Sequence, residues 1–224
     1  MNKRMRKALL VAACFALTIC LSIGGTLAWL KGTTQTVTNT FTQGDVEIVL
    51  NEGEVYELAD INASKTDDLD EADLGKHKDN GETRTTTNTY QIVPGSVYDK
   101  DPIVSVVPTS EDCYLFVKFY EGSAATYLTY TSNLTADNGW TKLEGAANVE
   151  AGATLWYRVV EKEQETKSWN LLDGDTITVK NDIADDTMSN AAASQLVWTA
   201  YAIQKANIAD AATAWGYLNT PANP

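Results

Sequence analysis

The stretch Thr36–Leu50, TVTNTFTQGDVEIVL, has a side-chain pattern that decides the fold class. Larger side chains alternate with threonine in its first half and with glutamate or valine in its second half. The alternating positions are Val37, Asn39, Phe41, Val46, Ile48 and Leu50. A period of two with β-branched residues is typical of strands that are buried on one face. We therefore expect two strands here, joined at Gly44–Asp45.

Strand patterns recur along the rest of the chain, separated by segments rich in glycine, proline, aspartate and asparagine. The expected strands are 90–93, 103–107, 114–120, 127–130, 140–143, 154–160, 176–179 and 195–203. The run at 114–120 is apolar throughout, which favours a strand buried on both faces. Apolar residues at spacings of three and four predict a short helix at 208–218. Together these elements predict an all-β fold, an antiparallel jelly-roll-like β-sandwich with a short C-terminal helix.

The N-terminal segment has the features of an export signal, which we expect to form a helix. Its basic residues are Lys3, Arg4, Arg6 and Lys7. The uncharged apolar run Ala8–Ile23 follows, and Gly24–Gly25 then interrupts it. Cleavage after Ala28 would leave Trp29 as the new N-terminus. The alternative is an uncleaved membrane anchor, because Trp29 and Leu30 extend the apolar run to about the 20 residues that a span needs.

The domain organisation follows from this cleavage site. We expect a signal peptide at 1–28, a single β-sandwich domain at 29–218 and a tail at 219–224. The formal net charge of the chain is −13, and the leader carries four basic residues and no acidic one. The mature protein is therefore still more acidic, which disfavours binding to nucleic acid and to anionic membranes. We expect contact with a membrane only through an uncleaved leader.

Cysteine use limits how the mature chain is stabilised. Cys14 and Cys20 lie in the leader, so that only Cys113 remains after cleavage. An internal disulfide is then impossible, although the protein is expected to be secreted. Cys113 precedes a buried strand, which favours a small buried hydrophobic side chain; the alternative is a reactive or intermolecular thiol.

Residues 51–88 lose the strand pattern and gather charge, which predicts a mobile acidic surface insertion, with a helical turn near residues 67–74. Its clustered carboxylates are weak candidates for a Ca²⁺ site, because Ca²⁺ takes oxygen ligands. The candidates are Asp67, Asp68, Asp70, Glu71 and Asp73. The order of an EF-hand loop is absent, so a solvated acidic loop is the simpler interpretation. His77 lies in the same insertion, and we expect it to be solvated.

Few residues suggest catalysis. His77 is the single histidine, and the sequence has no HExxH motif, CxxC pair or glycine-rich phosphate loop. We therefore expect no enzyme and no bound cofactor, although carboxylate pairs of the glycosidase type cannot be recognised from sequence. Tryptophans suggest a different role, since exposed rings can stack on sugars. We expect Trp156 and Trp198 in the core and Trp140 and Trp169 exposed.

Several short motifs, in this order over most of the chain, resemble the TasA/camelysin family. They are GGTLAWL at 24–30, VTNTFTQGDVEIVL at 37–50, VPG at 93–95, KDP at 100–102, SED at 110–112, YLFVK at 114–118, AYAIQ at 200–204 and AW at 214–215. The resemblance implies a Gram-positive protein exported through a SipW-type signal peptidase. It also implies a secreted component of the biofilm matrix or cell surface, including fibre subunits. The absence of HExxH argues against the protease activity sometimes attached to camelysin.

Two functions follow as expectations. The first is a structural protein that assembles with itself or with related matrix subunits, with residues 29–42 passed as a strand to the next subunit. Val37, Asn39 and Phe41 would be the alternating residues of that strand. The same segment could instead pair within its own domain. The second function is a secreted module that binds a glycan or a host surface without catalysis, through exposed aromatic residues and Ca²⁺-bridged carboxylates.

Overall fold

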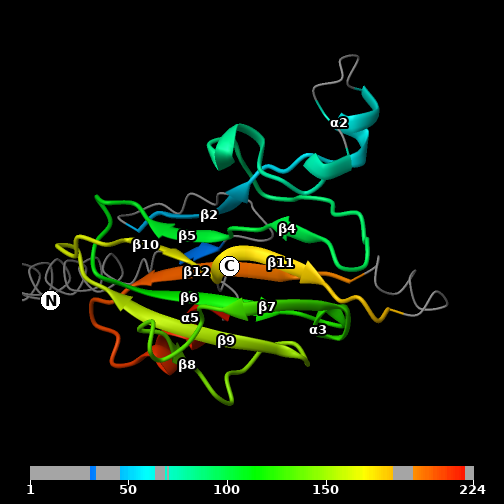
Figure 1. Cartoon of the computed structure of the whole chain (residues 1–224). Coiled ribbons are helices and arrows are strands. Elements are labelled where there is room, and N and C mark those ends of the chain that lie inside the picture. The colour runs from blue at the N-terminus through cyan, green and yellow to red at the C-terminus, as the bar shows by residue number, and fades with distance from the viewer. Residues whose placement is uncertain (1–30, 34–45, 64–68, 70, 184–193, 220–224) are drawn as a thin grey trace, which may run out of the picture. The chain divides into compact units, whose positions relative to one another are not determined.

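The computed structural model describes residues 31–33, 46–63, 69, 71–183 and 194–219. This part of the chain is mostly β-strand in antiparallel sheets, and a short helix ends it (Figure 1). The prediction of an antiparallel, mainly β fold with a C-terminal helix is therefore confirmed. The expected signal helix, the cleavage site at Ala28 and Trp29, and Val37, Asn39 and Phe41 lie outside the described residues.

The described strands form three sheets. The strands are β1 (Lys31–Thr33), β2 (Ile48–Gly53), β3 (Arg84–Thr85), β4 (Val97–Asp99), β5 (Ile103–Val106), β6 (Cys113–Tyr120), β7 (Leu128–Ser132), β8 (Thr141–Lys142), β9 (Ala153–Val160), β10 (Ser168–Asn170), β11 (Leu172–Val179) and β12 (Val197–Gln204). The helices are α2 (Leu58–Ala63), α3 (Ala124–Tyr127) and α5 (Ala211–Asn219), with 3₁₀ turns η1 (Glu71–Asp73) and η2 (Lys78–Gly81). The sheet orders are β1-β12-β6-β9-β8, β10-β5-β2-β3 and β4-β11-β7.

Strand β6 is the centre of the five-stranded sheet. It pairs along its full length with β12 on one side and with β9 on the other. Its side chains are almost all buried, as the continuous apolar run predicted. A strand can be buried on both faces only when other strands or helices pack against both faces of its sheet.

One face of this sheet packs against strands of the other two sheets. Leu115, Val117 and Phe119 point to this side and share one apolar core with β2, β5 and β11. In β2 the predicted alternation is confirmed, because Ile48 and Leu50 are each 3% exposed. Trp198 belongs to this core, as expected, and Trp156 packs against it.

Helix α5 covers the opposite face. The ring of Trp215 lies 5.4 Å from that of Phe116 and 5.1 Å from that of Tyr201, measured between centroids. Its indole N–H donates to the carbonyl of Ala147 at 2.7 Å. The predicted helix is therefore present, but it begins at Ala211, and its buried residues are Ala211, Ala214 and Trp215.

Residues 51–88 differ from the expected mobile insertion where they are described. Strand β2 continues to Gly53, and Val55 is completely buried and forms a bridge to His77. Gly75 has a φ of +69°, and a Cβ there would lie 2.2 Å from the ring of Tyr98. In Figure 1 this cyan segment, with α2, rises from the end of β2. The described part of the segment is thus not uniformly solvated, because Lys76 and Arg84 form ion pairs with Asp99 and Asp101 outside it.

Two local predictions also need correction. Residues 90–93 form no strand, because no described strand pairs with them, although Tyr90 and Ile92 pack against the core. Strands β4 and β10 were not predicted, since each is only three residues long and lies among turn residues. Short strands of this kind depend on a neighbour for their hydrogen bonds and leave a weak sequence signal.

Candidate functional site

Strand β1 is the first feature with a possible role in assembly. It pairs antiparallel with β12, with Lys31 opposite Ile203 and Thr33 opposite Tyr201. Residues 31–33 belong to the segment 29–42 that was expected to act as an assembly strand. The described part of that segment therefore lies at the edge of the five-stranded sheet and pairs within its own chain.

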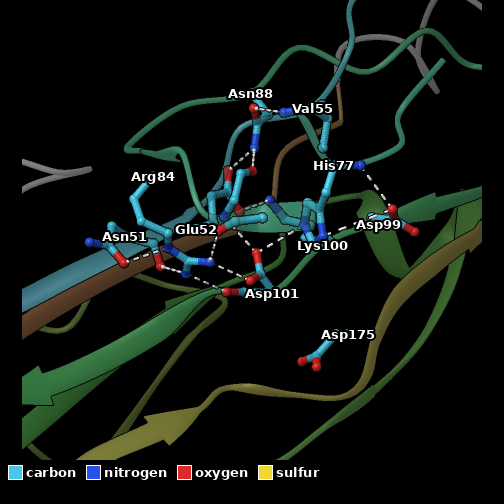
Figure 2. A network of polar contacts seen from close by, with 12 residues as sticks. Asn51, Glu52, Val55, His77, Arg84, Asn88, Asp99, Lys100, Asp101 and Asp175 are labelled. Atoms are coloured by element: carbon cyan, nitrogen blue, oxygen red, sulfur yellow. Dashed lines mark hydrogen bonds and ion pairs between the residues drawn. The ribbon is translucent and has the colours of Figure 1, made fainter. Parts of the chain in front are cut away.

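A second feature is a buried polar network at the end of β2 (Figure 2). The inward-facing register of Ile48 and Leu50 continues to Glu52, which places a carboxylate in the interior. Glu52 Oε2 accepts a hydrogen bond from Lys100 Nζ at 2.6 Å, and the side chains are 9% and 8% exposed. Each charge of this ion pair stabilises the other, in place of the water that burial removes.

Aromatic rings enclose the Lys100 ammonium group. Its Nζ lies 5.1 Å from the centroid of Tyr90 and 5.4 Å from that of Trp198, within range of a cation–π interaction. Burial, together with the nearby Glu52 carboxylate, raises the pKa of the Tyr90 phenol well above its usual value. The phenol therefore remains a donor, and it donates to the carbonyl of Asp99 at 2.9 Å.

Asn88 is held on the other oxygen of Glu52. Its Nδ2 donates to Glu52 Oε1 at 3.0 Å and to the carbonyl of Gly53 at 2.8 Å, while its Oδ1 accepts from the N–H of Val55 at 3.1 Å. These three contacts fix which end of the carboxamide is nitrogen. Residues far apart in sequence thus meet at one carboxylate.

Asp101 binds the charged part of the segment 51–88 to the sheet. Its Oδ1 accepts from the N–H of Gly53 at 2.6 Å, and its Oδ2 accepts from Arg84 Nη1. The side chain is 12% exposed. His77 Nε2 lies 3.1 Å from Asp101 Oδ1, but without the alignment of a hydrogen bond.

The expectation that His77 is solvated was wrong. Its side chain is 16% exposed, and its main-chain N–H donates to Asp99 Oδ2 at 2.9 Å. A Cβ at Gly53 would lie 2.7 Å from the His77 ring, so that glycine allows the imidazole to approach the strand. His77 is thus part of the packing between the segment and the sheet.

A cavity of roughly 680 Å³ opens beside the network. Glu52, Asn88 and Lys100 line its polar side, and Leu128 and Ile177 are among the residues of its apolar side. The polar side chains of the network therefore share one recess with an apolar wall.

Trp140 and Trp169 are less exposed than the sequence led us to expect. Trp140 is 2% exposed and belongs to the core, so it cannot stack on a sugar. Trp169 is partly buried, and its ring lies 6.2 Å from that of Trp140. The Arg158 guanidinium is 4.9 Å from the Trp140 ring and 4.1 Å from the Trp169 ring, and burial lowers its pKa. The Arg158 side chain thus lies over both rings.

The Ca²⁺ candidates are only partly described. Asp67, Asp68, Asp70 and the side chain of Glu71 lie outside the described residues. Asp73 is half-buried at the end of η1, and its carbonyl accepts from the N–H of Lys76 at 3.0 Å. The described residues contain no group of three or more histidine, cysteine or acidic side chains arranged to hold a metal ion.

Cys113 has the predicted place in the core. Its side chain is fully buried as a free thiol at the start of β6. Burial, opposed only in part by nearby Lys167, raises the pKa of the thiol to about 12.

We expect that folded protein does not react with a thiol reagent at about pH 8, where so little thiolate is present. Unfolding in denaturant should make Cys113 reactive, as peptide mass spectrometry can measure. A Thr109→Cys variant provides the control, because Thr109 is exposed and its cysteine should react in the folded state. Rapid modification of Cys113 in the folded wild type would contradict this assignment.

Sequence reasoning missed most of the polar network. Lys100 and Asp101 stood out only as part of the KDP motif, and Arg84 and Asn88 not at all. One signal was available, because the alternation of β2 places Glu52 on the buried face, where a carboxylate requires partners. The identity of those partners depends on contacts 36 to 48 residues away along the chain.

Comparison with known proteins gives no relative: no family model, curated protein or solved structure matches this chain. Within the described residues, every helix is too short or too polar to cross a lipid bilayer.

Proposed function

We propose that this chain is a secreted structural protein of the extracellular matrix or cell surface, and that it assembles into fibres by exchange of its N-terminal strand. On this proposal a SipW-type peptidase removes the leader after Ala28, and the domain is a jelly-roll-like β-sandwich without catalytic function. The observation that carries the proposal is the position of β1. It follows the expected cleavage site, is the edge strand of the five-stranded sheet and pairs with β12 of its own chain, which is the pairing that exchange would replace.

The physical argument concerns the energy of exchange. A strand at the edge of a sheet is held by main-chain hydrogen bonds, which an identical strand from a second copy can replace. Hydrogen bonds lost within one chain are then regained between two chains. The protein concentration therefore determines whether the monomer or the assembled form predominates. Because the contact is head-to-tail and does not close on itself, it produces filaments.

We expect purified protein that starts at Trp29 to form filaments visible by electron microscopy. Protein that lacks residues 29–42 should remain folded, because the described core starts at Val46, and should remain monomeric. Circular dichroism and light scattering check the fold and the size. Equal assembly of the two proteins would refute strand exchange.

Paired cysteines distinguish exchange from pairing within one chain. Gly32 lies directly opposite Ala202, a position where antiparallel strands bring Cα atoms to about 4.5–5.5 Å, suitable for a disulfide. In a Gly32→Cys/Ala202→Cys variant, exchange should give a ladder of covalent oligomers on a non-reducing gel. Pairing within the chain should give only cross-linked monomer. Each single-cysteine variant is the matched control.

The alternative function, a secreted module that binds a glycan or host surface, has less support. It relied on exposed tryptophans, but Trp140 is buried and Trp169 packs against Arg158. Ca²⁺ binding in the acidic segment and membrane contact through a retained leader remain proposals that concern residues mostly outside the described part.

A further inference from the structure

Glu52, Lys100 and Asn88 form a triad in which one carboxylate holds an amine and a carboxamide. Glu52 Oε2 accepts from Lys100 Nζ at 2.6 Å, and Glu52 Oε1 accepts from Asn88 Nδ2 at 3.0 Å. Figure 2 shows the two interactions converging on this one side chain. An amine nucleophile, an amide electrophile and a group that can move a proton are the components of an acyl transfer.

We propose that Lys100 and Asn88 become joined by an intramolecular isopeptide bond, with Glu52 as the proton carrier. Glu52 takes a proton from the Lys100 ammonium group, and the freed lone pair of Nζ attacks Cγ of Asn88. The Nζ–Cγ bond forms, and Glu52 gives a proton to Nδ2. The Cγ–Nδ2 bond then breaks, and ammonia leaves with the second proton of the amine. No oxidant or other reactant is consumed.

The surroundings favour the proton transfer that starts this reaction. The side chains of Glu52 and Lys100 are 9% and 8% exposed, and the rings of Tyr90 and Trp198 lie beside the ammonium group. Lys100 Nζ and Glu52 Oε2 lie 2.6 Å apart, so a proton can pass directly from the amine to the carboxylate. A neutral amine is the form that attacks a carbonyl carbon.

The electrophile is also oriented. The N–H of Val55 donates to Asn88 Oδ1 at 3.1 Å, where negative charge develops when Cγ is attacked. The carbonyl of Gly53 accepts from Nδ2 at 2.8 Å and directs the leaving group away from that donor. Because Glu52 holds both the amine and the carboxamide, less entropy is lost when these two groups react than when they meet in solution.

The bond would covalently close residues 88–100 and tie the segment after β3 to the segment before β5. The bond would provide a covalent cross-link that Cys113 cannot provide, because Cys113 is buried and free. The inference does not depend on fibre assembly, since all three groups belong to one chain.

The test is the intact mass of purified protein that starts at Trp29, measured under denaturing conditions. We expect a mass lower than the sequence mass by one molecule of ammonia. Proteolysis should give one branched peptide that contains both Asn88 and Lys100. A full sequence mass, with these two residues in separate unbranched peptides, would overturn the proposal even if every variant failed to fold.

Three variants assign the roles. Lys100→Arg removes the primary amine, and Glu52→Gln keeps the shape but removes the proton carrier; both should retain the full mass. Asn88→Asp should form the same amide with loss of water in place of ammonia. A purely structural network would change stability in these variants but would leave every mass at its sequence value.

Discussion

Replacing Asp101 with alanine is expected to lower the free energy of unfolding by about 3 kcal/mol, because it removes a buried carboxylate from a partly exposed guanidinium and from a main-chain N–H. The carboxylate accepts from the Arg84 guanidinium and from the N–H of Gly53, and its side chain is 12% exposed. Without it, a guanidinium and a main-chain donor lose their partners where water has limited access. Urea unfolding monitored by tryptophan fluorescence measures the change.

The matched control is Glu150→Ala. Glu150 forms an ion pair with Lys118 at 2.8 Å, but its side chain is 47% exposed. Solvent screening limits such a pair, so we expect a change below about 1 kcal/mol. If the two variants were equally stable, the network around Asp101 would not anchor the segment 51–88 to the sheet.

Trp215→Ala is expected to lower the free energy of unfolding by a similar amount, about 3–5 kcal/mol, because it removes a large buried ring. Trp215 is 3% exposed and contacts the rings of Phe116 and Tyr201. Its loss uncovers one face of the five-stranded sheet and leaves the carbonyl of Ala147 without its indole donor. Thermal unfolding by calorimetry can measure the effect.

A substitution at the next residue of α5 serves as a control, because it should raise the stability that Trp215→Ala lowers. Gly216 is exposed in α5, and a Cβ there would meet no atom within 4 Å. Gly216→Ala should therefore raise stability by about 0.5–1 kcal/mol, since alanine is the better helix former. Destabilisation by Gly216→Ala, or tolerance of Trp215→Ala, would show that α5 does not pack on the sheet as described.

The polar network and the strand edge have different places in the proposed function. On the proposal above, a second copy attaches to β12 once β1 has left it, and the network holds the segment 51–88 to the sheet within one copy. A subunit that bears load along a fibre benefits from such internal ties, because force otherwise opens weakly paired strands first. The proposed Lys100–Asn88 bond would make one of these ties covalent.

The fold was predictable where local pattern and burial agree. Alternation in β2 and the continuous apolar run of β6 reflect one covered face and two covered faces, and both signals are present in the sequence. The spacing of Ile208, Ala212, Trp215 and Leu218 likewise predicted a helix in this segment, and α5 begins at Ala211. Strand β10 was missed because its pairing with β5 stabilises it more than its own residues do.

The site was less predictable, for a physical reason. The charges in residues 51–88 indicated a solvated loop, because the sequence shows each charge but does not show its partner. The side chain of His77 is only 16% exposed, and Trp140 is buried beneath Arg158 and Trp169. In both cases the contacts come from other segments of the chain.

The sequence by itself determined the antiparallel β class, the C-terminal helix and the burial of Cys113, since these depend on the period and polarity of neighbouring residues. Only the tertiary structure decided that Glu52 holds Lys100 and Asn88 on its two oxygens and that β1 pairs with β12. A buried charge or an edge strand is stable only with a particular partner. That partner comes from a distant part of the chain, and folding alone brings the two together.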